Sequence, residues 1–252
     1  MPRNQINSIE QLISQIKIDY MNWNTSTHPW FRGEPESETP LLPKLYRKKK
    51  DEPNHNENQL LQFFRMKAPS LTRGAILPPR ENTDQWLFLA QQVGLPTRLL
   101  DWTEGALIAL YFAVLVEKPI VWMLNPVGLN QLSVSEGITL EDNEFPLTWF
   151  SPTDKGINIG SENIKGAWQK NQLGVDLPVA ILPTSIHPRM GAQKNCFTVH
   201  GKKKLPLSEL IGSDLLKEYV INHEHSKEMM KELRMLGISH TTIFPEPEGL
   251  SE

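Results

Sequence analysis

Proline is the feature that most limits what this chain can fold into. The sequence holds 20 prolines, more than its 15 glycines, and they are spread over all 252 residues. A proline inside a helix or a central strand removes a backbone hydrogen bond and usually ends the element. We therefore expect many short elements joined by ordered loops, and not a repeat of long helices. The composition, 39% apolar and 22% charged, is typical of a globular chain long enough for one sizeable core or two small ones.

Apolar periodicity divides the chain into short candidate elements. The spacing predicts helices at residues 8–21, 57–68, 83–93, 104–116 and 213–235, the last with a break near 222–223. Aromatic and β-branched runs predict strands at 30–33, 97–103, 120–124, 179–182, 196–199 and 240–244, while 34–56 and 125–176 are typical of loops. We find no internal repeat and no linker long enough to force a second domain. We expect one α+β domain with a mixed, mostly antiparallel central sheet flanked by helices.

The charge balance and the cysteine content restrict the partners and the compartment. The formal net charge is −3, which argues against broad coating of nucleic acid but leaves room for a local basic groove. Cys196 is the only cysteine, so an internal disulfide and a multi-cysteine zinc site are excluded. No segment has the ~18 consecutive apolar residues of a membrane helix, and residues 1–20 lack a signal-peptide apolar region. We therefore expect a cytoplasmic protein without a membrane partner.

The first candidate functional residue is Arg32, in the aromatic run Trp30-Phe31-Arg32-Gly33. A guanidinium among bulky rings is partly buried and needs a fixed anionic partner. One interpretation is a clamp for phosphate or carboxylate, with Gly33 letting a ligand approach the backbone closely. The other is an ion pair inside the protein with an acid such as Asp101. Local sequence alone favours the ion pair.

The second candidate is the segment GLPTRLLDWT at residues 94–103. Strand alternation divides its side chains between two faces, with Thr97, Asp101 and Thr103 on one and Arg98 and Trp102 on the other. A row of hydroxyl, carboxylate and hydroxyl groups suits a ribose. A structural network in which Asp101 caps the helix that begins near residue 104 explains the same residues equally well.

The third candidate is the segment 187–198, in which His187, Arg189 and Gln193 precede a predicted strand. Polar residues at a strand entrance occur in functional sites and in ordinary loops, so this signal has little weight alone. Cys196 lies inside that strand and is typical of an inert core thiol. The sequence has no P-loop, no GxGxxG and no GxSxG motif.

Taken together, these segments resemble the FRG domain family of bacterial and phage proteins. The stretches that carry the resemblance are WFRG at 30–33, WLFLAQQVGLPTRLLDWTEGALIALYFA at 86–113, IVWMLNP at 120–126, Arg189 to Phe197, and LRMLGISHTTIFPEPEGL at 233–250. The resemblance implies a single FRG-type domain over residues 1–252. Its core motifs would lie in 24–126, and the C-terminal half, 127–252, would complete the sheet and the site.

The order of these parts is similar to that of an ADP-ribosyltransferase core, which implies a split sheet and NAD as the substrate. Such cores open with an Arg-Gly strand, continue with a hydroxyl-bearing strand before a helix, and bring in a catalytic acid later. The likeness implies catalytic roles for Arg32, Asp101, Arg189 and Gln193, and NAD-binding roles for Arg32, Gly33, Thr97, Arg98, Trp102 and Thr103. Gln193 stands near the place of the acid and cannot act as a base. The alternative carboxylates are Asp101, Glu246 and Glu248.

These observations leave three functions open. The first is an ADP-ribosyltransferase-like effector, of toxin or phage-defence type, that transfers ADP-ribose from NAD to protein or nucleic acid, or hydrolyses NAD, without a metal. The second is a binding module without chemistry that recognises a nucleotide or a nucleic-acid end. It would use Arg32, Arg98 and the lysine runs at 48–50 and 202–204. The third is a metal-dependent nuclease or hydrolase built on Asp101, Glu104 and His187, which the spacing supports poorly.

Overall fold

The computed structural model describes residues 5–23, 28–34, 40–47, 56–71, 77–135, 149–150 and 176–245. Within these ranges the strands form a seven-stranded sheet in the order β4-β5-β6-β2-β1-β3-β7, and each neighbouring pair is antiparallel. The strands are β1 (Trp30–Gly33), β2 (Leu99–Thr103), β3 (Ile120–Leu124), β4 (Trp149–Phe150), β5 (Val179–Pro183), β6 (Asn195–Val199) and β7 (Leu216–Val220). Parallel pairing appears as an isolated bridge between Ile6 and Ile221. The structure confirms the predicted α+β fold with a mostly antiparallel sheet.

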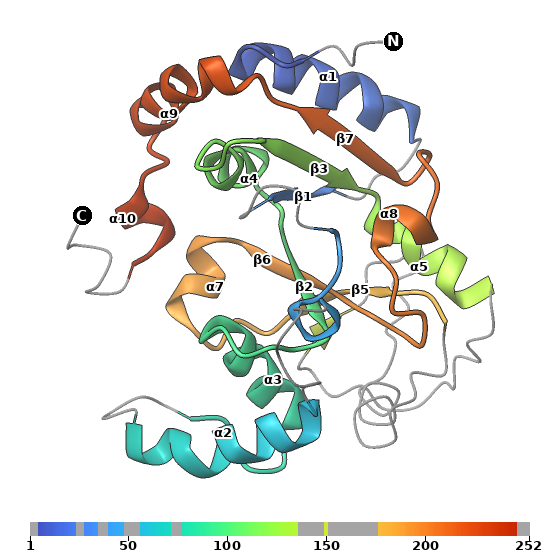
Figure 1. Ribbon diagram of the computed structural model, residues 1–252, viewed down its shortest axis with the longest axis vertical. Helices are drawn as coiled ribbons and strands as arrows, with labels where there is room; N and C mark the ends of the chain where they lie inside the picture. Colours follow the sequence, from blue (N-terminus) through green and yellow to red (C-terminus); the bar gives the residue numbers. More distant parts are fainter. Residues whose placement is uncertain are drawn as a thin grey trace.

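The sheet is nearly divided between β1 and β2. Four residues of β1 pair with β3, and five residues of β2 pair with β6. Between β1 and β2, by contrast, the register contains a single pair, Phe31 opposite Thr103. The two parts, β4-β5-β6-β2 and β1-β3-β7, therefore diverge at this junction, and Figure 1 shows β3 and β7 on one side of β1 and β5 and β6 on the other.

Helices cover both parts of the sheet and complete its apolar clusters. One cluster joins α1, α4 and α9 to β3 and β7 around Val121 and Tyr219. Another joins α2 and α3 to β5 and β6, where the rings of Phe88 and Phe197 stack with centroids 5.5 Å apart. A third joins α5 and α8 to the strands around Trp102. The helices are α1 (Ile9–Asn22), α2 (Glu57–Leu71), α3 (Thr83–Gln92), α4 (Ala106–Ala113), α5 (Pro126–Ser135), α7 (Pro188–Ala192), α8 (Leu207–Leu210), α9 (Ser226–Met235) and α10 (His240–Ile243), with 3₁₀ turns η1 (Lys44–Tyr46) and η2 (His223–His225).

The N-terminal elements follow the sequence prediction closely. Ser8 accepts a hydrogen bond from the main-chain N–H of Gln11 and so caps α1 at the start of the predicted helix. Gly94 has a φ of +83° and ends α3, because glycine adopts this left-handed conformation without strain. The next residues run extended into β2, so the segment that carries Asp101 starts at the end of one helix and finishes at the start of the next.

Two C-terminal segments differ from the prediction. The helix predicted at 213–235 begins only at Ser226, and its first part is the strand β7. Pairing of β7 with the edge of β3 outweighs the helix propensity of its leucine, lysine and glutamate residues. The strand predicted at 240–244 is the helix α10, because Ser239 and Thr242 form a capping box.

The predicted loop at 125–176 is also partly wrong. It contains α5, which starts on Pro126, and proline is well suited to the first position of a helix. It also contains the two-residue strand β4. Residues 136–148 and 151–175 lie outside the described residues.

Candidate functional site

A cavity of about 240 Å³ lies where β1 and β2 diverge. Its walls come from both parts of the sheet, from α3, α4 and α7, and from the residue that follows α10. The residues predicted for the site that line it are Arg32, Gly33, Asp101, Trp102, Thr103, Arg189 and Gln193. The three separate stretches of chain singled out in the sequence therefore meet around one hollow. Thr97 and Arg98 do not line it.

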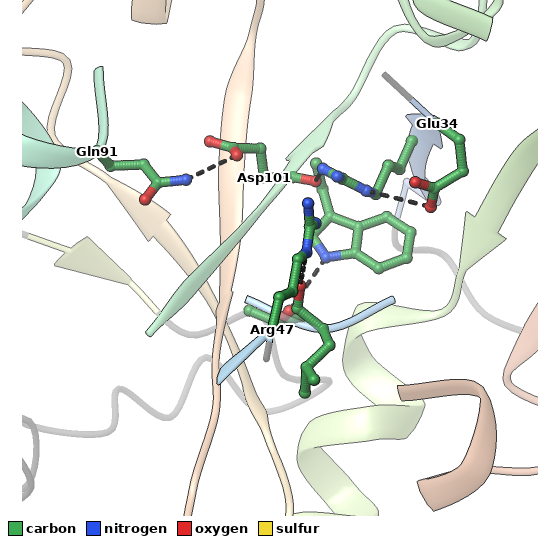
Figure 2. Close-up of polar contacts among 8 residues, drawn as sticks. Glu34, Arg47, Gln91 and Asp101 are labelled. Atoms are coloured by element: carbon green, nitrogen blue, oxygen red, sulfur yellow. Dashed lines mark hydrogen bonds and ion pairs between the residues drawn. The ribbon is translucent and has the colours of Figure 1, made fainter. Parts of the chain in front are cut away.

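Arg32 enters the cavity wall from β1 with two fixed contacts. Its Nη1 donates a hydrogen bond of 2.8 Å to the main-chain oxygen of Asp101, and its Nε lies 3.6 Å from the Glu34 Oε1. Figure 2 shows the two acids, Asp101 and Glu34, and marks the ion pair to Glu34 with a dashed line. The ion pair expected with the Asp101 side chain is therefore made with Glu34, which lies two residues along the same chain and is buried. The contact with Asp101 is to its backbone.

Gly33 is required by the packing of a helix. A Cβ built on Gly33 would lie 1.9 Å from the main-chain oxygen of Ala109 and 2.7 Å from the main-chain nitrogen of Ala113. Both atoms belong to α4, so any larger residue would force α4 away from β1. The close approach expected of a ligand is made here by a helix, although Gly33 also lines the cavity.

Asp101 is held from the α3 side of the cavity. Its Oδ2 accepts a hydrogen bond of 2.7 Å from the Gln91 Nε2 (Figure 2), and the Gln91 Oε1 accepts one from the Thr97 hydroxyl. The Asp101 carboxylate does not cap α4. Burial raises the pKa of Asp101 above its usual value, while the nearby Arg32 charge and the Gln91 hydrogen bond act against this rise. The result is a desolvated carboxyl group in a wall that also carries a guanidinium.

Arg98 belongs to the core and not to the cavity. Its Nη2 lies 2.6 Å from the Glu57 Oε2, its Nε donates to the same oxygen at 2.7 Å, and its main-chain N–H donates to Oε1 at 2.8 Å. Both side chains are buried. This pair joins α2 to the start of β2. Thr97 and Arg98, which the sequence assigned to NAD binding, therefore lie outside the cavity, and both make contacts within the protein.

Thr103 and Gln193 connect β2 to the C-terminal half. The Thr103 hydroxyl donates to the main-chain oxygen of Gln193 at 2.7 Å and accepts from the Gly105 N–H at 3.0 Å, which supports the start of α4. The Gln193 Nε2 donates to the main-chain oxygen of Ile243 at 3.3 Å. Both residues thus line the cavity and fix its frame at the same time.

Arg189 and Phe244 form the wall contributed by the last part of the chain. The Arg189 Cζ lies 5.1 Å from the centroid of the Phe244 ring, a cation–π contact. Phe244 also meets Phe112 of α4 edge to face, with centroids 6.0 Å apart. His187 caps α7, with its Nδ1 accepting from the Arg189 N–H at 3.3 Å. The segment 187–193 therefore presents Arg189 and Gln193 to the cavity and uses His187 elsewhere.

Sequence reasoning missed several residues of the cavity. These are the lining residues Phe31, Gln91, Gln92, Ile108, Ala109, Phe112, Asn195 and Phe244, and Glu34 beside Arg32. Gln91 and Gln92 end a helix directly before the segment 94–103, and Ile108 and Phe112 are four residues apart on one helix face. Those two signals were present in the sequence. Phe244 was missed because its segment was predicted as a strand.

The other candidate groups do not assemble at this cavity. Among the described residues, no three His, Cys, Asp or Glu side chains gather as a metal site would require. Cys196 is fully buried, and burial raises the pKa of its thiol well above the usual value, as expected of a core residue. Lys202, Lys203 and Lys204 are exposed. The lysine run at 48–50, Glu246 and Glu248 lie outside the described residues.

Comparison with known proteins gives one match. Residues 27–119 match the sequence profile of the FRG domain. No curated protein and no solved structure gives a match. The matched range contributes β1, α3, β2 and α4 to the cavity, whereas α7, β6 and Phe244 lie beyond it. In the ranges that the structure describes, no helix combines the length and the apolar character needed to cross a membrane.

Proposed function

We propose that this protein, whose residues 27–119 match the FRG domain, binds NAD in the cavity that this range helps to form and breaks the bond between nicotinamide and ribose. The ADP-ribose unit would pass to water or to an acceptor group on a protein or nucleic acid. One observation carries the proposal: Arg32, Asp101 and Gln193, far apart in the sequence, line the same hollow at a split in an antiparallel sheet.

The dimensions of the cavity limit how NAD would bind. Small-molecule sites usually enclose about 300–1,000 Å³, and this cavity encloses about 240 Å³. A dinucleotide would therefore place one half inside and leave the other half over the rim. The aromatic side chains of Phe31, Phe112 and Phe244 in the wall favour the flat nicotinamide ring with its ribose as the enclosed half.

The chemistry matches the polar groups around the cavity. As the bond from the ribose C1′ to the nicotinamide nitrogen breaks, its electron pair leaves with nicotinamide and positive charge develops on the sugar. A nucleophile then attacks C1′ and loses its proton to solvent. A carboxylate on Asp101 would stabilise the charge and accept a hydrogen bond from a ribose hydroxyl. Arg32 would orient a phosphate oxygen, because a guanidinium presents several N–H groups in one plane.

The test uses the whole chain and NAD labelled in the nicotinamide ring. We expect release of labelled nicotinamide, and calorimetric binding of ADP-ribose, by the unaltered protein. The variant Arg32→Lys keeps the charge and loses the planar fork, so turnover should fall about tenfold or more. Arg65→Lys, on α2 outside the cavity, is the matched control and should leave turnover unchanged. Failure of the folded protein to bind either NAD or ADP-ribose would refute the proposal.

A binding module without turnover is the second candidate. The observation that favours it is that polar groups of the site bond to the protein itself. Gln91 donates to the Asp101 carboxylate, and Gln193 donates to the backbone of α10. Asp101 is also the one acidic residue among the described residues that line the cavity. This candidate predicts nucleotide or oligonucleotide binding that weakens steeply with salt, and no release of nicotinamide.

A further inference from the structure

A directed chain of hydrogen bonds ends on the Asp101 carboxylate. It starts at the main-chain N–H of Leu99, which donates to the Thr97 Oγ1 at 3.2 Å. The Thr97 hydroxyl donates to the Gln91 Oε1, and the Gln91 Nε2 donates to the Asp101 Oδ2 at 2.7 Å. Thr97 is buried and lies outside the cavity, Gln91 and Asp101 line it, and the chain thus joins the backbone of β2 to the site.

From this arrangement we infer that Thr97 and Gln91 are positioning residues that keep Asp101 an ionised carboxylate in the cavity wall. The inference rests on the proposed function only for the use that the site makes of that carboxylate. Neither residue was expected to act in this way: Thr97 was assigned to the ligand, and Gln91 was not singled out.

The direction of the chain follows from what each group is able to donate. A backbone N–H only donates, so the Thr97 oxygen accepts from Leu99, and the Thr97 hydroxyl proton is directed at the Gln91 oxygen. The Gln91 oxygen therefore faces Thr97, and the amide NH₂ faces Asp101. A protonated Asp101 with its proton on Oδ2 would place two donors against each other. The amide would then have to turn over and lose its bond from Thr97.

The chain acts against the effect of burial. Desolvation favours the neutral form of Asp101, and the charged groups that act on it are Arg32 from β1 and Arg47 after η1, both of which favour the anion. Cys196 of β6, which lies within electrostatic reach, has a thiol that burial keeps protonated. A hydrogen bond to a charged group contributes more than one between neutral groups. Gln91 therefore adds a fixed hydrogen-bond donor to the two arginine charges.

In the proposed reaction this arrangement has a specific use. An ionised Asp101 accepts a hydrogen bond from a ribose hydroxyl and stabilises the positive sugar, and a protonated Asp101 does neither as well. Because Thr97 lies behind Gln91, a change there would act on the carboxylate without removing any atom that contacts NAD.

The experiment measures Asp101 directly in the ligand-free, full-length protein. The side-chain carboxyl ¹³C signal, assigned by its disappearance in Asp101→Asn, is followed by NMR against pH. Thr97→Val keeps the shape of the side chain and loses the hydroxyl. We expect it to raise the pH midpoint of the Asp101 titration by about one unit, because the carboxylate is then held less firmly by Gln91. Gln91→Leu should raise it at least as far, and Thr97→Ser should restore the original value. Thr198→Val, which removes a buried threonine hydroxyl that accepts from Trp102, is the matched control and should leave the midpoint in place.

Each outcome bears on the inference. A midpoint that stays unchanged in folded Thr97→Val, or in folded Gln91→Leu should the first variant fail to fold, would overturn it. A rise of equal size in Thr198→Val would overturn it too, because any loss of buried hydrogen bonding would then have the same effect. The titration needs no NAD, so absence of NAD binding would refute the proposed function and leave this result standing. If NAD is turned over, the acidic limb of the pH–rate profile should move with the NMR midpoint.

Discussion

Two buried arginines, Arg32 and Arg98, differ in how completely the chain satisfies them. Arg32 is 7% exposed and Arg98 is 4% exposed, so burial does not distinguish them. Arg98 and its backbone make three contacts of 2.6–2.8 Å with Glu57. Arg32 donates one hydrogen bond to a main-chain oxygen, and its acid, Glu34, lies 3.6 Å from Nε.

The comparison separates a buried arginine of the core from one in a site by the hydrogen bonds that each makes within the protein. A guanidinium that contacts one close acid through both Nε and Nη2 has that edge committed to the protein. One with a more distant acid and a single carbonyl keeps N–H groups for another acceptor, and Arg32 also lines a cavity whereas Arg98 does not. The following predictions test this contrast, beginning with the largest effect.

The first prediction concerns the ion pair between Arg98 and Glu57. Glu57→Gln removes the charge that balances Arg98 and leaves a buried cation without its acid. We expect the free energy of unfolding to fall by about 3–5 kcal/mol, measured by urea denaturation at pH 7. Binding of ADP-ribose by the protein that remains folded should be unaffected. A smaller loss of unfolding free energy in Glu57→Gln than in Glu34→Gln would contradict the contrast between the two arginines.

The second prediction extends the contrast to pH. His200 donates its main-chain N–H to the Arg98 oxygen at 3.2 Å, and the residue is fully buried. Burial lowers the pKa of His200 from 6.5 to about 4. Between pH 6.5 and pH 4 His200 is protonated in the unfolded chain but stays neutral in the folded chain. The free energy of unfolding therefore falls as the pH falls. The loss should reach about 3 kcal/mol between pH 6.5 and pH 4.

His200→Leu is the variant that isolates this effect. Urea unfolding of both proteins at pH 7 and pH 4.5 should show a steeper loss in the unaltered protein. Asp101 has a raised pKa, so its contribution has the opposite sign, but both proteins share it and it cancels in the comparison. Equal losses in the two proteins would show that His200 is not the group responsible.

The third prediction concerns the ion pair between Arg32 and Glu34. Glu34→Gln keeps the shape of the side chain and removes its charge. Because the ion pair is 3.6 Å long, we expect a loss of unfolding free energy of about 1–2 kcal/mol, well below that of Glu57→Gln. The Arg32 charge would no longer be shared, so ADP-ribose should bind about fivefold more tightly, which corresponds to about 1 kcal/mol. Calorimetry measures the binding, and weaker binding would show that Glu34 orients Arg32 more than it neutralises it.

The contrast also shows what the sequence alone made predictable. The Arg-Gly strand and the segment 94–103 were identified from unusual residue combinations, and the segment 187–198 from polar residues before a predicted strand. The structure brings all three to one cavity. Glu34, the acid beside Arg32, lies two residues along the same chain, and strand alternation places such residues on one face. That partner was within reach of the same reasoning.

Contacts over long separations were not predictable in this way. Glu57 reaches Arg98 across 41 residues, and no local pattern in the sequence links them. Phe244 reaches the cavity because a capping box folds the tail into α10, whereas its β-branched threonines favour a strand in isolation. Tertiary packing alone decides the first case. In the second case the local capping box outweighs the β propensity of the threonines.

The smallest expected effect concerns the arginine at the far wall of the cavity. Arg189 stacks on Phe244 at 5.1 Å, and Arg65 stacks on Trp86 at 5.8 Å in the α2–α3 region. Arg189→Met and Arg65→Met should each lower the unfolding free energy by about 0.5–1 kcal/mol, the usual contribution of such a contact. Only Arg189→Met should weaken ADP-ribose binding, by about two- to fivefold, as measured by calorimetry. If both variants weaken ADP-ribose binding equally, the weakening results from lost packing. Arg189 would then have a structural role, as Arg98 has.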